Sequence, residues 1–184
     1  MLRAINSKTN KIVLLSLFIS IAVVLHIIEA SFPYFIFPWA KLGLPNIAIL
    51  FALIYFGLKE GLYVSFIKTI MGGFITGTIG NPIFIMSISG SIISTIIMWI
   101  CLPLQNRKFT LVTISIIGAL AHITTQFLIV WLFFFSNLNL TNSGMLLAAP
   151  YFIIFALPVG FLTGMAANFT ISYLNKIIPY SQRN

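Results

Sequence analysis

Apolar residues occupy six long runs of this 184-residue chain, and short segments that are polar or contain Gly or Pro separate the runs. The runs cover residues 12–30, 44–58, 61–78, 82–103, 109–135 and 151–174. A helix rises about 1.5 Å per residue and the hydrocarbon core of a bilayer is about 30 Å thick, so runs of about 20 apolar residues predict transmembrane helices. The pattern predicts an all-α polytopic membrane protein, a compact bundle of six transmembrane helices that forms one domain over residues 1–184.

The composition supports a membrane protein. Hydrophobic residues make up 60% of the chain, charged residues only 7%, and the mean hydropathy is +1.09. A soluble globule needs more polar surface than this chain can provide. The net charge of +8 does not indicate nucleic-acid binding, because the basic residues are scattered at the ends of apolar runs and form no polar face.

The basic residues predict the orientation. If six spans alternate, eight of the ten Lys and Arg residues lie on the side of both termini, and Lys41 alone lies on the opposite side. Lys and Arg accumulate in cytoplasmic segments, so we expect a multi-pass protein of the cytoplasmic membrane with both termini in the cytoplasm.

A lysine interrupts the third apolar run and is the first candidate for function. Lys68 has no acidic neighbour in the sequence, and a charge within a membrane helix is costly, so it predicts a binding site. His122 and Gln126 lie one turn apart in the fifth run and bring further hydrogen-bonding groups. We expect these three side chains to hold the polar head of a small-molecule substrate.

Small and hydroxyl residues form stripes in the same runs. Ser65 and Gly72 share a helical face with Lys68, and Ser115 and Gly118 share one with His122. Ser87, Ser91 and Ser94 form a similar face in the fourth run. Such residues more often permit close helix packing than ligand binding, so the glycine pairs 73/77 and 160/164 predict packing.

Other polar residues leave two interpretations open. His26 and Glu29 share one face at the end of the first run, either as interfacial anchors or as ligands of the substrate. The connection 31–43 is rich in aromatic residues, among them Trp39, and forms either an interfacial belt or a lid over a site. Asn46 at the start of the second run and Asn81 before the fourth complete the candidate substrate-binding residues.

The residues argue against an enzyme. The chain has two carboxylates, Glu29 and Glu60, and no aspartate, and it lacks a P-loop and a dinucleotide fingerprint. A cluster that holds metal-bound phosphate therefore cannot form, and we expect neither a metal nor a cofactor.

Five motifs together carry a family resemblance: LGLPN at 42–46, FGLKEG at 56–61, GGFITGTIGNP at 72–82, SISGSIIS at 87–94 and GALAHITTQ at 118–126. In these the chain resembles the Gx transporter family, also labelled heptaprenyl diphosphate synthase component I. That family is similar to the substrate-binding S components of energy-coupling factor (ECF) transporters. Ser16 and Ser20 stand where S components often carry two alanines for docking, and Lys68 stands where the family more often has arginine.

The resemblance implies a membrane-embedded subunit that binds a small vitamin-like, isoprenoid or quinone-precursor molecule for an ECF-type uptake transporter. Its partners would be the lipid bilayer, the transmembrane coupling subunit, which docks at Ser16 and Ser20, and the ATPase subunits. The family label leaves an alternative, a non-catalytic membrane partner of a heptaprenyl or polyprenyl diphosphate synthase in quinone biosynthesis.

Overall fold

The protein is an all-α bundle. The computed structural model describes residues 8–31, 43–105, 109–135 and 142–177, and within these ranges it contains six α-helices. They are α2 (Lys8–Ser31), α3 (Asn46–Phe56), α4 (Leu58–Ile75), α5 (Pro82–Cys101), α6 (Leu111–Val130) and α7 (Asn142–Ile177). A 3₁₀ turn (Leu102–Leu104) follows α5, and a π-helical turn (Trp131–Phe135) follows α6.

Local chemistry explains several helix boundaries. The side chain of Asn81 accepts a hydrogen bond from the Ile83 N–H and caps α5, whose first residue is a proline. Thr110 caps α6 by accepting from the Thr113 N–H. Gly57 has a φ of +93°, a conformation that suits glycine, and it lets the chain turn directly from α3 into α4.

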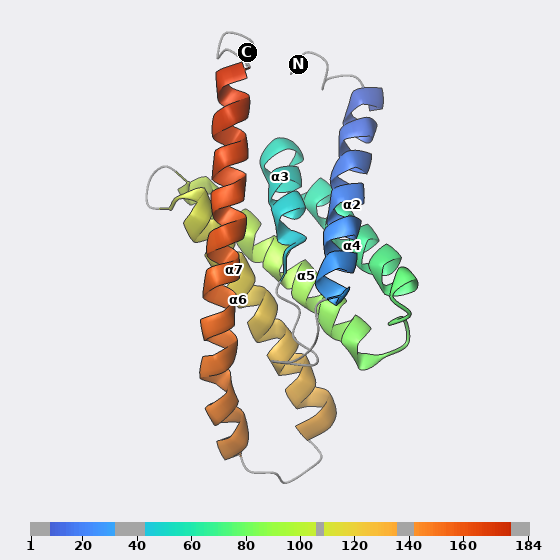
Figure 1. Ribbon diagram of the computed structural model, residues 1–184, viewed down its shortest axis with the longest axis vertical. Coiled ribbons are helices and arrows are strands. Elements are labelled where there is room, and N and C mark those ends of the chain that lie inside the picture. Colours follow the sequence, from blue (N-terminus) through green and yellow to red (C-terminus); the bar gives the residue numbers. More distant parts are fainter. Residues whose placement is uncertain (1–7, 32–42, 106–108, 136–141, 178–184) are drawn as a thin grey trace.

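The short helix α3 lies at the centre of the bundle. It contacts each of the other five helices, whereas the outer helices pack in the order α2, α4, α5, α6, α7. Successive helices run in alternate directions, so that the start of α2 and the end of α7 lie at the same end of the bundle (Figure 1). We call this the terminal end and the other the distal end.

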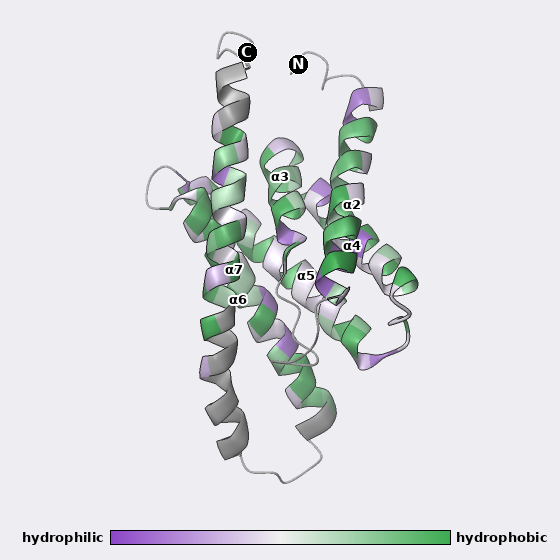
Figure 2. Ribbon diagram, in the orientation of Figure 1, coloured by the Kyte–Doolittle hydropathy of each residue, from purple (hydrophilic) through white to green (hydrophobic). Residues whose placement is uncertain are grey.

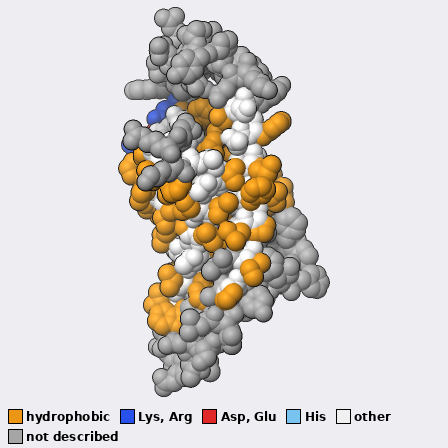
Figure 3. Space-filling view, turned by 90° about the vertical axis from the view of Figure 1, so that its left-hand side faces the viewer, with side chains coloured by type: hydrophobic (Ala, Val, Ile, Leu, Met, Phe, Trp, Pro, Cys, Tyr) orange, Lys and Arg blue, Asp and Glu red, His pale blue; other side chains and the backbone are white. Residues whose placement is uncertain are grey.

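The described surface is that of a membrane protein. The segments Thr9–Ser31, Pro82–Leu104 and Leu111–Phe133 are long and apolar enough to cross a bilayer. Large apolar side chains such as Phe74 and Phe169 are exposed, whereas Lys68 and Gln126 are buried. Hydropathy colouring and a space-filling view show the same predominance of apolar side chains (Figures 2 and 3). Many exposed large apolar side chains together with a buried lysine are unusual in a soluble protein.

The structure confirms six helices but corrects their lengths. The central helix α3 has 11 residues and rises about 16 Å, too little to cross the bilayer alone, because it lies between Pro45 and Gly57. The last helix starts at Asn142, although the sequence predicts a loop up to residue 149. Pro150 and Pro158 both lie inside it, as neighbouring helices permit in membrane proteins.

The two glycine pairs have different roles. A Cβ atom added to Gly160 would lie 2.6 Å from the Ile116 Cα, and one added to Gly164 would lie 2.5 Å from the Val112 Cα. These glycines therefore let the backbones of α6 and α7 touch, as predicted. Gly77 has a φ of +67° with no neighbour within 4 Å of its Cβ position, so the prediction of packing was wrong there, and Gly77 forms the turn after α4.

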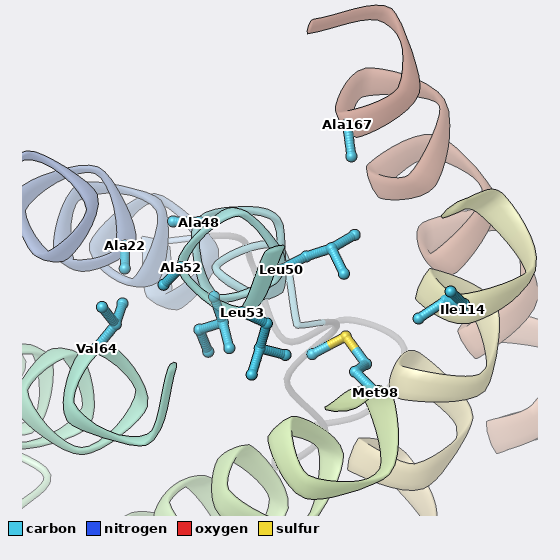
Figure 4. Packing of buried hydrophobic residues seen from close by; sticks show 10 residues of the cluster. Ala22, Ala48, Leu50, Ala52, Leu53, Val64, Met98, Ile114 and Ala167 are labelled. Atoms are coloured by element: carbon cyan, nitrogen blue, oxygen red, sulfur yellow. The ribbon is translucent and has the colours of Figure 1, made fainter. Parts of the chain in front are cut away.

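Apolar side chains fill the terminal half of the bundle. We call them the apolar layer; its members are Ala22, Ala48, Ile49, Leu50, Ala52, Leu53, Val64, Met98, Ile114 and Ala167. Leu50 and Leu53 project from the central helix, and Met98 and Ile114 lie around it on α5 and α6 (Figure 4). Most of the buried polar side chains lie beyond this layer, but Thr95 and Ser115 are buried at its level.

Candidate functional site

Buried polar residues collect in the distal half of the bundle. Because the helices alternate in direction, the ends of α2, α4 and α6 and the starts of α3 and α5 all point toward the distal end (Figure 1). We call nine of the buried polar residues in this part of the bundle the polar layer; they are His26, Glu29, Asn46, Ser65, Lys68, Ser87, Ser91, His122 and Gln126. All nine are at most 6% exposed. Six of the eight candidate substrate-binding residues thus lie in one layer.

The register of α4 against α5 positions Lys68. A Cβ added to Gly61 would lie 3.5 Å from the Thr95 Cγ2, and one added to Gly73 would lie 2.8 Å from the Phe84 Cδ2. Gly61 and Thr95 therefore lie at the same level. Because α4 and α5 are antiparallel, one turn further along each helix Ser65 lies level with Ser91. After the next turn Lys68 lies level with Ser87. Lys68 is 1% exposed and is the largest fully buried side chain among the described residues.

His122 joins α6 to α5. A Cβ added to Gly90 would lie 3.1 Å from the His122 Nδ1, so the imidazole occupies the space that a larger residue at position 90 would fill. The Nε2 atoms of His122 and Gln126 lie 2.8 Å apart and form a hydrogen bond. The same register brings Gln126 level with Ser87, and therefore to the level of Lys68.

His26 brings α2 against α4. The imidazole of His26 covers Gly72, where an added Cβ would collide with the ring at 2.2 Å. Gly72 follows Lys68 by one turn on the same face of α4. His26 therefore lies within about one helical turn of Lys68 along the bundle.

Glu29 connects α2 to the segment that precedes the central helix. Its carboxylate accepts a hydrogen bond from the Gly43 N–H. Gly43 has a φ of +90°, which favours glycine, and an added Cβ there would lie 2.9 Å from the Asn46 Nδ2 and 3.7 Å from the His122 Cδ2. Glu29, Asn46 and His122, from α2, α3 and α6, therefore all lie near Gly43.

Several buried polar atoms lack a hydrogen-bond partner among the described residues. They are both amide atoms of Asn46 and the hydroxyl oxygens of Ser65, Ser87 and Ser91. Other buried hydroxyls differ: Thr69, Ser94 and Thr95 each donate to a carbonyl of their own helix. Leaving a buried donor or acceptor unsatisfied costs about 1–3 kcal/mol. The layer therefore has hydrogen-bonding capacity available for a bound molecule or water.

Other predicted residues lie elsewhere. Asn81 is exposed at the start of α5, where its side chain caps the helix. Ser16 and Ser20 are exposed on α2, and the Ser20 hydroxyl donates to the Ser16 carbonyl at 2.8 Å. Trp39 lies outside the described residues.

The sequence analysis interpreted Ser65, Ser87 and Ser91 as packing residues, whereas their hydroxyls lack a partner among the described residues. They belong to the stripes that share a face with Lys68 or with one another, and all three are buried. Periodicity shows which residues share a face. It does not show which hydroxyls bond to their own helix and which remain available.

The chemistry of the site is hydrogen bonding and charge. Among the described residues, no group of three or more His, Cys, Asp or Glu side chains is placed to hold a metal ion. Lys68, Asn46, Gln126 and the serines are donors, and the Asn and Gln carbonyls and the hydroxyls are acceptors. Such an arrangement can hold and orient a polar group.

The comparison with known families gives one match. Residues 18–170 match the family described as heptaprenyl diphosphate synthase component I. No curated protein and no solved structure matches the chain. The match includes α3, α4, α5, α6 and every residue of the polar layer. It confirms the family that the sequence motifs indicate, and the chain belongs to the heptaprenyl diphosphate synthase component I family.

Proposed function

We propose that the chain is a non-catalytic membrane component that assembles with a polyprenyl diphosphate synthase. The observation that supports this most directly is its membership of a family described as a component of such a synthase. The helical bundle with its apolar surface would hold the assembly at a membrane, where long prenyl chains partition.

The positions of the two carboxylates support a non-catalytic role. Glu60 lies at the start of α4, near the terminal end, and pairs with Lys11 at 2.5 Å. Glu29 lies in the polar layer and accepts from the Gly43 N–H. These acids occupy opposite halves of the bundle, and the sequence contains no aspartate, so they cannot jointly hold a magnesium–diphosphate complex.

The polar layer is the proposed site for a small molecule, an isoprenoid or quinone precursor that the assembly uses. Lys68, Asn46, His122 and Gln126 would contact its polar head, with His26 and Glu29 beside them. Burial of all six side chains at one level supports this assignment. We further propose that the termini face the cytoplasm, because the basic residues concentrate on that side.

A second candidate is the substrate-binding subunit of an ECF-type uptake transporter. The surface of α2 favours it: Ser16 and Ser20 are exposed one turn apart, and small residues let another membrane helix approach closely. In this case the partners are a transmembrane coupling subunit and ATPase subunits.

Affinity purification of the tagged full-length protein from membranes of its host, with quantitative mass spectrometry, separates the two proposals. Co-purification of a polyprenyl diphosphate synthase supports the role as a synthase component. If coupling and ATPase subunits co-purify and no synthase does, that role is refuted and the role in an uptake transporter is supported.

A double variant, Ser16→Leu with Ser20→Leu, tests the docking surface. It should remove the coupling subunit if that subunit docks on α2. Ser31→Leu is the matched control, because Ser31 is also exposed on α2 and donates to a carbonyl of its own helix.

A further inference from the structure

We infer that the polar layer accepts an uncharged head that both donates and accepts hydrogen bonds, such as a ring that carries amide, carbonyl or hydroxyl groups, and does not accept a diphosphate. This inference rests on the proposed function in one respect, that the layer binds a small molecule.

Hydrogen-bonding capacity is the first argument. Asn46 offers a donor and an acceptor, and Ser65, Ser87 and Ser91 offer hydroxyls that do both, all without a partner among the described residues. A diphosphate has only acceptors when ionised. It would leave the Asn46 Oδ1 atom unsatisfied, whereas a head with an N–H or O–H group would satisfy it.

These groups come from three helices that meet at one level. The register of α4 and α5 places Ser65 and Ser91 at the same level, and Ser87 follows one turn further toward the distal end. Asn46 begins the central helix, and a Cβ added at Gly43 would lie near both its amide and the His122 ring. The ring of His122 also lies against Gly90, between the two serines of α5. We infer that a single small head contacts groups on α3, α4 and α5.

Charge is the second argument. Lys68 and Glu29 are the charged side chains buried among the described residues, and their formal charges cancel. A diphosphate would add several negative charges to an interior that holds one lysine and one glutamate, and buried charge in excess of its partners is strongly unfavourable. An uncharged head leaves the balance unchanged.

A pair of probes that differ in charge tests the inference directly. 4-Hydroxybenzamide and 4-hydroxybenzoate have the same ring and hydroxyl group, but one carries an amide and the other a carboxylate. Farnesyl diphosphate provides the phosphate case. Binding is measured with the full-length protein in lipid nanodiscs by calorimetry, and we expect the amide to bind at least about tenfold more tightly than either anion.

Variants connect that preference to the layer. Asn46→Leu, and Ser87→Ala with Ser91→Ala, should each weaken 4-hydroxybenzamide binding at least about tenfold. Ser89→Ala is the matched control, because Ser89 lies on the same helix and donates to the Ile85 carbonyl. This variant should bind 4-hydroxybenzamide as tightly as the unchanged protein does. Thermal unfolding of each variant verifies that it folds, and the serine changes remove only one oxygen atom each.

Three results would overturn the inference. The first is tighter binding of either anion, and the second is amide binding that the serine variants do not weaken. The third is that no probe binds, which would make water the partner of the Asn46 and serine atoms. The proposed function is tested separately. If the synthase does not co-purify but the amide preference holds, only the assembly is refuted; anion preference in a protein that retains its synthase refutes only the inference.

Discussion

Replacing Gly164 with alanine should destabilise the protein, although the same change usually stabilises a helix. In a helix interior, alanine is favoured over glycine by about 1 kcal/mol. In α7, however, the added methyl carbon would lie 2.5 Å from the Val112 Cα and 3.1 Å from the Val112 carbonyl oxygen. These are backbone atoms of α6, which cannot rotate away as a side chain can.

The magnitude follows from two opposing terms. Overpacking of a closely packed contact costs about 1–3 kcal/mol, and contact with backbone places this site toward the upper part of that range. After the gain in helix propensity is subtracted, we expect a net loss on the order of 1–2 kcal/mol. The hydrogen bond between Ser115 and Thr163, 2.6 Å long, joins the same two helices and would weaken as they separate.

Cys101 provides the assay. It is the single cysteine of the chain and is partly buried, so a thiol-reactive fluorescent dye reports unfolding in detergent. The unfolding temperature should fall by roughly 2–8 °C in Gly164→Ala. Ala166→Leu, at an exposed position of the same helix, should change it little. An unchanged or higher unfolding temperature in Gly164→Ala would refute the close approach of α6 and α7.

Three further predictions follow from other parts of the bundle. Lys68→Met removes a buried donor and should weaken 4-hydroxybenzamide binding at least about tenfold by calorimetry, whereas the exposed Lys59→Met should not. Glu60 lies in the first turn of α4, just before the third predicted span, and the hydrogen bond from Lys11 lowers its pKa. The pair therefore stabilises the protein at neutral pH. That stabilisation, roughly 0.2–1 kcal/mol, should disappear as pH falls through the lowered pKa. The unfolding temperature of Glu60→Gln, measured over the same pH range, should not show this loss. A variant whose only cysteine is Asn142→Cys should react with an impermeant maleimide from outside intact cells, and one with Lys59→Cys should not; equal reaction would refute the orientation.

The helices and their inward faces were predictable because local rules determine them. Apolar run length predicts the helices, and 3.6-residue periodicity predicts that Lys68 and His122 face the interior with their small neighbours. The start of α7 was predicted less well. Asn142 and Ser143 resemble a loop, and Pro150 resembles a break, yet α7 continues through both prolines.

Contacts between helices could not be predicted from periodicity. Helix packing determines the central place of α3, the hydrogen bond from Gly43 to Glu29 and the common level of Ser65 and Ser91. Packing depends on many residues of several helices together, and no single stretch of sequence predicts it. Asn81 shows the converse. Its local role as a helix cap follows from the Asn-Pro sequence, whereas its predicted place in the binding site required tertiary information.

The apolar layer has a consequence for the movement of solutes. A polar molecule held at the level of Lys68 meets Leu50, Leu53, Met98 and Ile114 between itself and the terminal end, and these side chains are almost fully buried. Moving its polar groups past these side chains would strip them of hydrogen bonds. Under the proposed function beside a synthase, the molecule would not need to pass these side chains. Passage across the membrane would require a partner that forces the surrounding helices away from α3.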